Sequence, residues 1–351
     1  MDWSKVRNLL AIRLDNLGDV FICEPALRAL KKGMPEARLT LMASPNGARA
    51  AELLPCVDDV MVRRVVWQDA HRRMPLDTAR EHQLVEDIRR RAFDAAIIFT
   101  SFSQSPYPPA YACYLAEVPL RVGQSKEFGG SLLTTWVKAG PDDMHQVDRN
   151  LRLIEAIGLP VEDRHIRLRV PSEARASIAE KLAGQGIAEG QEFVVLNPVA
   201  SCSARTYSPS RFARVASALA GSLPVLLTGE AKDGQIVQQI LEEAASDRLV
   251  SLCGQTSVAE LVALIERSSL IISNLTSTAH IASAVGTPTV LLFPGTELLS
   301  QWEPRGCPSI VLQREVGCSP CYLFDCPGSH QCLDITPDEV VEACRRLLLE
   351  T

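Results

Sequence analysis

Short apolar segments alternate with helix-like segments along the chain, and this alternation is the feature that most constrains the fold. Segments typical of strands are 9–14, 38–42, 60–66, 95–99, 120–123, 193–196, 224–227, 249–252, 270–272, 289–293 and 310–312. Helical patterns lie between them, at 25–32, 47–54, 78–91, 109–116, 146–157, 209–220, 233–245, 258–266, 279–285 and 337–348. Strands that alternate with helices form parallel sheets covered by helices. The sequence therefore predicts an α/β fold.

The alternation pauses between Pro160 and Pro171, in a segment rich in proline and charge that we interpret as a hinge. We expect an N-terminal Rossmann-like domain over residues 1–165. A C-terminal Rossmann-like domain is expected over 172–351, with a Cys-rich loop at 318–332 and a final helix. The chain of 351 residues is long enough for both. Two doubly wound domains that face one another would leave a central cleft at the carboxyl ends of their strands, where ligands bind in such folds.

Composition excludes several classes of function. A net charge of −6 argues against nucleic acid as the main partner, because no basic field offsets phosphate repulsion. No run approaches the roughly 18 to 20 apolar residues of a membrane-spanning helix. The first residues, MDWSKVR, lack the apolar core of a signal peptide. We therefore expect a cytoplasmic protein, and any contact with the inner membrane face would be peripheral.

The first polar motif directly follows the first predicted strand and reads Arg13-Leu-Asp-Asn-Leu-Gly18-Asp19. Gly18 permits a tight turn, which would present Asp19 at the carboxyl edge of the sheet. A carboxylate there can accept a proton from an attacking hydroxyl group. The alternative is that Asp19 only caps a helix. The loop lacks the G-x-G-x-x-G glycines of a dinucleotide site, which disfavours a nicotinamide enzyme.

A second polar motif follows the strand-like segment 270–272, where Thr276, Ser277 and Thr278 precede His280 at the start of a predicted helix. The first N–H groups of a helix lack partners within the helix, and together with the helix dipole they favour a phosphate. The three hydroxyls and the imidazole would add further contacts. The alternative is that the hydroxyls merely cap the helix and that His280 packs beside the sheet.

Two more loops of the second half carry groups suited to a nucleotide. The loop after 193–196 offers hydroxyls and a planar cation for phosphate oxygens, namely Ser201, Ser203, Thr206 and Arg205. Glu230 or Asp233, after the next strand, could accept hydrogen bonds from the vicinal hydroxyls of a ribose. In both loops the alternative is an ordinary solvated turn.

Four of the eleven cysteines crowd into fifteen residues, Cys318, Cys321, Cys326 and Cys332. A C-x2-C pair followed by two more thiols can give four sulfur ligands to one zinc or iron ion. Free thiols, or disulfides formed on purification, are the alternative. The other seven cysteines lie in or beside apolar stretches and are interpreted as buried thiols.

Taken together, these motifs resemble glycosyltransferase family 9, the heptosyltransferases that build the inner core of bacterial lipopolysaccharide. The matching segments run over nearly the whole chain, at 12–20, 25–30, 120–123, 145–151, 158–159, 197–198, 252–254 and 273–280. The resemblance implies a GT-B fold and inverting transfer of a heptose or similar sugar from an ADP-sugar, ADP-heptose above all. It also implies a lipopolysaccharide-core-type acceptor hydroxyl and no divalent metal at the diphosphate.

Carried across by position, Asp19 looks like the catalytic base, and Arg205 stands where the family has a phosphate-binding lysine. Thr276, Ser277 and His280 align with the family's Asp-Ser/Thr-Gly-x-x-His signature at the donor diphosphate. Leu275 replaces the acidic residue of that signature and Ser277 its glycine. These departures leave the donor sugar undetermined.

Several alternatives stay open. One branch of the resembling family glycosylates autotransporter proteins and carries an iron-binding finger built from four cysteines, so the acceptor could be a protein instead of a glycolipid. A non-catalytic sugar-nucleotide-binding relative and a two-domain nucleotide-sugar epimerase share the expected architecture. Acceptor contacts in such enzymes come from variable loops of the first domain, here 67–77 and 100–109.

Overall fold

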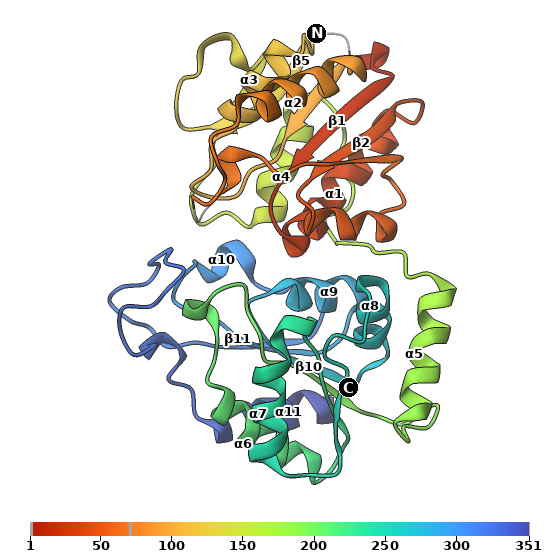
Figure 1. Cartoon of the computed structure of the whole chain (residues 1–351), viewed down its shortest axis with the longest axis vertical. Coiled ribbons are helices and arrows are strands. Elements are labelled where there is room, and N and C mark those ends of the chain that lie inside the picture. Colours follow the sequence, from red (N-terminus) through yellow and green to blue (C-terminus); the bar gives the residue numbers. More distant parts are fainter. Residues whose placement is uncertain (1–2, 70–71, 351) are drawn as a thin grey trace. The chain divides into compact units, whose positions relative to one another are not determined.

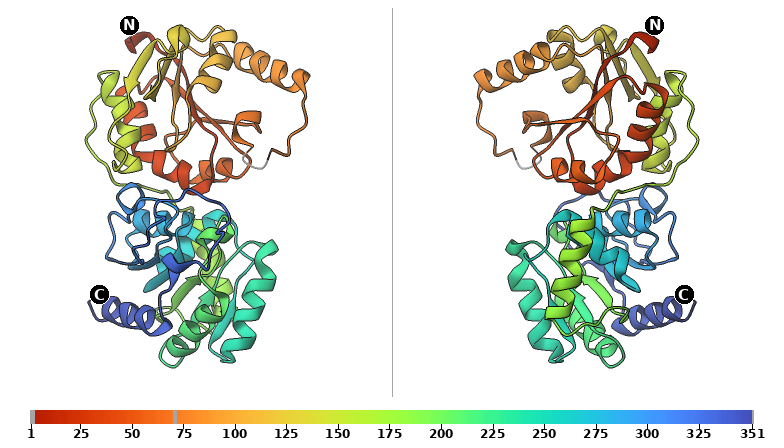
Figure 2. Two further views of the ribbon diagram at one scale, coloured as in Figure 1. Left: turned by 90° about the vertical axis from the view of Figure 1, so that its left-hand side faces the viewer. Right: turned by 90° about the vertical axis from the view of Figure 1, so that its right-hand side faces the viewer.

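A computed structural model describes residues 3–69 and 72–350. The chain divides into two compact units, Met1–Arg169 and Val170–Thr351. Each unit contains one six-stranded sheet, and Figures 1 and 2 show helices on both faces of each sheet. The predicted α/β class, with two Rossmann-like doubly wound units, is confirmed. Residues 70–71, within the predicted acceptor loop 67–77, lie outside the described residues.

The first unit is built on six parallel strands in the order β3-β2-β1-β4-β5-β6. The strands are β1 Asn8–Arg13, β2 Arg38–Ala43, β3 Asp59–Val62, β4 Ala95–Ile98, β5 Leu120–Ser125 and β6 Thr135–Lys138. The helices are α1 Leu17–Gly33, α2 Thr78–Arg90, α3 Tyr107–Leu115 and α4 Gln146–Ala156, with a 3-10 segment at Gly47–Leu53. Helix α1 packs with α4, and α2 packs with α3.

The second unit repeats this topology, with the strand order β12-β11-β10-β7-β8-β9. Its strands are β7 Val194–Asn197, β8 Val225–Leu227, β9 Leu249–Ser251, β10 Leu270–Asn274, β11 Thr289–Leu292 and β12 Ser309–Leu312. Its helices are α5 Ser172–Gly184, α6 Pro209–Ala220, α7 Gly234–Ala244, α8 Val258–Arg267, α9 Ser277–Val285, α10 Leu299–Trp302 and α11 Pro337–Glu350. Helices α6, α7 and α11 form one layer, and α5, α8 and α9 form another.

The central strands explain where ligands can bind. Strands β1 and β4 are buried almost throughout and pair in parallel, and β7 and β10 do the same in the second unit. Apolar side chains on both faces suit a sheet covered by helices. The strand order reverses between β1 and β4 and again between β7 and β10, and the carboxyl ends at such switch points are where ligands bind in doubly wound folds.

The structure corrects three details of the sequence-based prediction. Helix α1 begins at Leu17, not near Pro25, so Asp19 lies in its first turn instead of in a preceding loop. Proline is common at a first helical position, which suggested a later start, but Pro25 is buried inside the helix. Strand β6 and helix α5 were not predicted. The predicted strand 60–66 ends at Val62.

The proline- and charge-rich segment predicted as a hinge is bonded to α1 within the first unit. The Glu24 carboxylate is only 1% exposed and accepts hydrogen bonds from Arg28 Nε at 2.7 Å and from the Arg167 backbone N–H at 2.8 Å. Arg28 also donates to Asp163 at 3.2 Å. Lys32 pairs with Glu162. Residues 162–167 are therefore fastened to the first unit.

None of the helices within 3–69 and 72–350 is long and apolar enough to cross a membrane.

Candidate functional site

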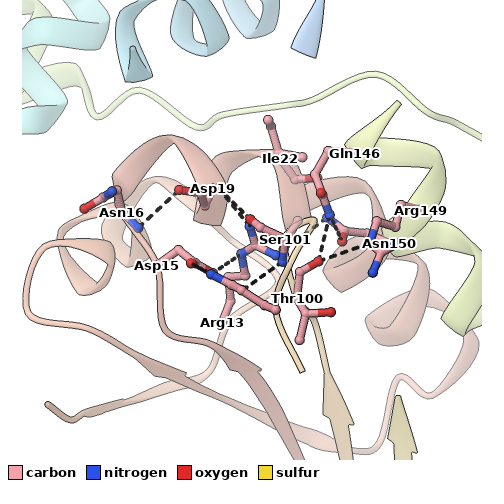
Figure 3. Close-up of polar contacts among 12 residues, drawn as sticks. Arg13, Asp15, Asn16, Asp19, Ile22, Thr100, Ser101, Gln146, Arg149 and Asn150 are labelled. Carbon is pink, nitrogen blue, oxygen red and sulfur yellow. Dashed lines mark hydrogen bonds and ion pairs between the residues drawn. The ribbon is translucent and has the colours of Figure 1, made fainter. Parts of the chain in front are cut away.

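A buried ion-pair network lies at the switch point of the first unit, where β1 leads into α1 (Figure 3). Arg13 ends β1, and its side chain is fully buried. Its guanidinium contacts two carboxylates, with Nε 2.9 Å from Asp15 Oδ2 and Nη2 2.8 Å from Asp19 Oδ1. One cation thus joins the strand end, the loop and the first turn of the helix.

Asp19 is held by donors from three directions. Besides Arg13, the Ser101 hydroxyl donates to Oδ1 at 3.3 Å, and the Asn16 backbone N–H donates to Oδ2 at 3.2 Å. Asp19 therefore does have the helix-capping contact considered as its alternative role. Its side chain is nevertheless 18% exposed, so part of the carboxylate is open to solvent at this edge of the sheet.

Asp15 is the more enclosed carboxylate of the two, with a side chain 10% exposed. Gln104, from the loop after β4, donates to Asp15 Oδ1 at 2.5 Å and accepts from the Ser101 backbone N–H at 2.9 Å. Burial raises the pKa of Asp15 above its usual range, while the neighbouring Arg13 opposes that shift. Gln104 therefore ties the β4 loop to the charged network.

Arg149, on α4, is a site residue that the sequence reasoning did not single out. It is 6% exposed, and its guanidinium carbon lies 4.8 Å from the centre of the Phe102 ring. Its Nε donates to the Thr100 carbonyl at 3.4 Å (Figure 3). Burial, with the nearby charge of Arg13, lowers the pKa of Arg149 to about 10. Among the described residues, no carboxylate lies within ion-pair distance of it. The segment 145–151 carried the family resemblance, but nothing in the sequence marked this arginine as unpaired.

At the switch point of the second unit, three hydroxyl groups bond to one another at the start of α9. Ser273 Oγ lies 2.6 Å from Thr278 Oγ1, which lies 2.7 Å from Thr276 Oγ1. Thr276 also caps the helix by accepting from the Thr278 N–H at 3.3 Å. Thr278 is buried, whereas Ser277 is half-buried. The hydroxyl best placed to meet a ligand at this helix start is therefore that of Ser277.

Asn274 joins the α9 start to the loop after β7, and the sequence reasoning missed this role. Its side chain donates to the Pro198 carbonyl at 2.9 Å and accepts from the Tyr207 N–H at 3.0 Å. Tyr207 itself is a core residue whose hydroxyl donates to the Ile335 carbonyl at 2.8 Å. The loop that carries Arg205 and the start of α9, where Ser277 lies, are therefore fixed to one another.

Arg205 lies at this edge but forms an ion pair with Glu297, from the loop after β11. Sequence reasoning missed Glu297, because 92 positions separate the two residues. Ser201 and Glu230 are exposed, and Glu230 pairs with Lys232 at 2.8 Å. His280 is buried, with its ring centre 6.1 Å from that of Trp302.

The four clustered cysteines do not fit a zinc or iron ion as they are placed. All four are free thiols: Cys318 is exposed and the others are half-buried. No group of three or more His, Cys, Asp or Glu side chains within the described ranges could hold a metal. Within these ranges the structure therefore does not support the metal site predicted from the sequence.

The Cys-rich loop instead bonds to the loops that carry Arg205 and Glu297. The Ala204 N–H donates to the Phe324 carbonyl at 3.0 Å, and Ser203 Oγ donates to Asp325 at 2.6 Å. The Cys321 N–H donates to the Gly295 carbonyl, also at 3.0 Å. Most of these contacts use backbone groups, and none uses a thiol.

Comparisons with known proteins agree with this architecture. Residues 81–329 match the model of glycosyltransferase family 9 (heptosyltransferase). Lipopolysaccharide heptosyltransferase 3 of Escherichia coli is 23% identical over 295 residues, which cover 82% of this chain and 83% of that protein. A family 9 glycosyl transferase from Veillonella parvula has a TM-score of 0.81 at 20% identity, with 100% of this chain and 99% of that chain covered.

A second solved structure, ADP-heptose lipopolysaccharide heptosyltransferase II of Escherichia coli, has a TM-score of 0.76 at 22% identity, and covers 98% of this chain and 99% of its own. At these identities the structural likeness shows the fold. The family model matches more than half of the residues, and the chain therefore belongs to glycosyltransferase family 9.

Proposed function

We propose that this protein is an inverting glycosyltransferase that moves a heptose from ADP-heptose to a hydroxyl of a lipopolysaccharide-core-type acceptor. Family membership and the names of its relatives support this activity. The observation that carries it is the placement of Asp19 at the first switch point, held by three donors yet open to solvent.

Asp19 would act as the general base of a single displacement. It takes the proton of the acceptor hydroxyl while that oxygen bonds to the anomeric carbon of the heptose. The bond from this carbon to the diphosphate oxygen breaks at the same time, and ADP leaves. Attack opposite to the leaving group inverts the anomeric carbon. Arg13 and Ser101 orient the carboxylate for this step.

The second unit would hold the donor. The first N–H groups of α9, with Ser277, suit the diphosphate, and the Arg205 guanidinium would add a charge-assisted contact. These groups would stabilise the charge that develops on the leaving ADP without a divalent metal. Glu230 or Asp233 would accept from the ribose hydroxyls. Thr276, Thr278 and His280 would support the helix start more than touch the donor, because the Thr276 hydroxyl is bonded to that of Thr278, and Thr278 and His280 are buried.

Arg149 would receive an anionic group of the acceptor. A nearly buried guanidinium without a carboxylate partner is costly, and a phosphate or carboxylate ligand would offset that cost. Its position beside Thr100 and the Asp19 network would place an acceptor hydroxyl near the base.

Product analysis tests this function. The purified chain is incubated with ADP-heptose and one of three acceptors: a deacylated lipopolysaccharide core, an unmodified autotransporter passenger protein, or none. ADP release that depends on the core acceptor, persists in EDTA and yields an inverted linkage supports the proposal. Transfer to the passenger protein alone would make the chain a protein heptosyltransferase. Donor binding without any turnover would make it a non-catalytic relative.

A further inference from the structure

Arg13 has an unusual position for an arginine, because its whole side chain is buried and it forms ion pairs with two carboxylates. Nε faces Asp15 at 2.9 Å, while Nη2 lies 2.8 Å from Asp19 and 2.5 Å from Ser101 Oγ. Its Nε and Nη1 are buried, and neither has a hydrogen-bond partner among the described residues, so the contact of Nε with Asp15 is an ion pair only. A buried cation without sufficient counter-charge is strongly unfavourable. The two carboxylates must therefore share the charge of Arg13.

We propose that Arg13 and Asp15 are positioning residues for Asp19: Arg13 fixes the orientation of its carboxylate, and Asp15 takes up part of the Arg13 charge so that Asp19 stays basic enough to accept a proton. This inference rests on the proposed role of Asp19 as the base. Neither residue would touch the substrate.

Two charges act on the Asp19 carboxylate: Arg13 favours its ionised form, and the Asp15 carboxylate opposes it. If Asp15 were neutral, the repulsion between the two carboxylates would disappear and the attraction of Arg13 would act unopposed. Asp19 would then be a weaker base. A neutral Asp15 should therefore slow proton abstraction even though every group that touches the substrate remains.

Few other groups around the network could produce the same effect. On α1, the neighbouring Cys23 is a neutral thiol, because burial raises its pKa to about 12. From the β4 loop, Ser101 and Gln104 are uncharged. Arg149, on α4, is a cation, so its charge would favour the ionised form of Asp19, whereas a carboxylate would oppose it. Asp15 is therefore the anion whose charge can be varied.

The pH dependence of kcat for Asp15→Asn provides the main test, at saturating ADP-heptose and core acceptor. We expect the acid limb of the profile to move down by about one pH unit, the usual scale of one nearby charge. The plateau rate should fall a few-fold, as a weaker base predicts. KM for the donor should stay unchanged. Glu117→Gln removes an exposed carboxylate of the same unit and should leave the profile unchanged.

Arg13→Lys separates orientation from charge. Lysine keeps the charge, but a single ammonium cannot reproduce the contacts that the planar guanidinium makes to both sides. We expect kcat to fall about 100-fold, with KM for the donor unchanged. A wild-type pH profile for Asp15→Asn, or wild-type kcat for Arg13→Lys, would overturn the proposal.

A readout independent of turnover keeps this inference distinct from the proposed function. Protein labelled with 13C at its aspartate carboxyls is measured by NMR, with Asp19 assigned from the Asp19→Asn spectrum. The chemical shift of the Asp19 carboxyl should differ between Asp15→Asn and wild type at one pH, even if no acceptor supports turnover. If Asp15→Asn fails to fold, Gln104→Leu replaces it. Loss of the 2.5 Å amide contact should favour protonated Asp15 and give a smaller shift in the same direction.

Discussion

The two units share one topology but fill their switch points with different chemistry. In the first, the strand end carries a buried arginine and two carboxylates. In the second, the corresponding edge carries hydroxyls, an asparagine and the N-terminus of α9, with one ion pair beside them. A charged network can hold a base, whereas hydroxyls and helix N–H groups suit a phosphate. The fold therefore supplies one switch point in each unit, and we propose that the side chains there place the base in the first unit and the donor site in the second.

Asp19→Asn should have the largest effect on turnover, because it removes the proposed base of the first unit. The amide keeps the shape of the side chain but cannot accept the acceptor proton, so ADP release should fall by roughly 100-fold or more. Donor affinity, measured by calorimetry, should stay unchanged if the donor is held by the other unit. Near-normal turnover would move the base to Asp15.

Arg149→Met should act on the acceptor alone. Loss of a charge-assisted contact worth about 1.5 to 3 kcal/mol would raise KM for the acceptor roughly ten- to a hundredfold. Methionine fills part of the space above Phe102 and limits loss of packing. The matched control is Arg152→Met on the same helix. A weakened donor affinity, or an unchanged acceptor KM, would show that Arg149 has only a structural role.

Arg205→Ala should give the opposite result, with weaker donor binding and an unchanged acceptor KM. We expect ADP affinity to fall roughly tenfold, at the low end of the range for a charged hydrogen bond, because part of the interaction is already satisfied by Glu297. Arg211→Ala, which removes a cation from the neighbouring helix α6, serves as the control. Unchanged affinity for ADP would exclude Arg205 from the diphosphate site.

Glu297→Gln should strengthen ADP binding, because the glutamate competes with a phosphate for Arg205. Removing the carboxylate frees the guanidinium and removes a negative charge near the diphosphate, so ADP should bind a few-fold more tightly. In an Arg205→Ala background the same change should have a smaller effect. Weaker binding in the single variant would mean that Glu297 holds Arg205 in its binding position instead of competing for it.

The sequence predicted the sheets well because strands that are buried on both faces consist mainly of consecutive apolar residues, as in Leu270–Asn274. It located Asp19 and the hydroxyls of α9 just after strands because a strand end is a local feature. It could not predict the partners of these groups. Arg205 and Glu297 lie 92 positions apart, and Ser101 reaches Asp19 across 82. Tertiary packing likewise decides that, among the described residues, no carboxylate lies within ion-pair distance of Arg149.

Replacing Cys321 and Cys326 together by serine should have the smallest effect of all. The loop that bears them meets the second unit's site through the Phe324 carbonyl, the Asp325 carboxylate and the Cys321 backbone, so the thiols themselves carry none of these contacts. ADP affinity should therefore stay within about twofold, well below the scale of one lost hydrogen bond. Elemental analysis of wild-type protein purified without added metal should show no stoichiometric zinc or iron. One metal per chain, lost in the double variant together with thermal stability, would contradict this expectation. It would show that the four sulfurs bind one ion and that the free energy of metal binding stabilises this loop. Asp325→Ala is the matched contrast, because it leaves every sulfur in place yet breaks the Ser203 contact, and it should weaken ADP binding more than the loss of both thiols.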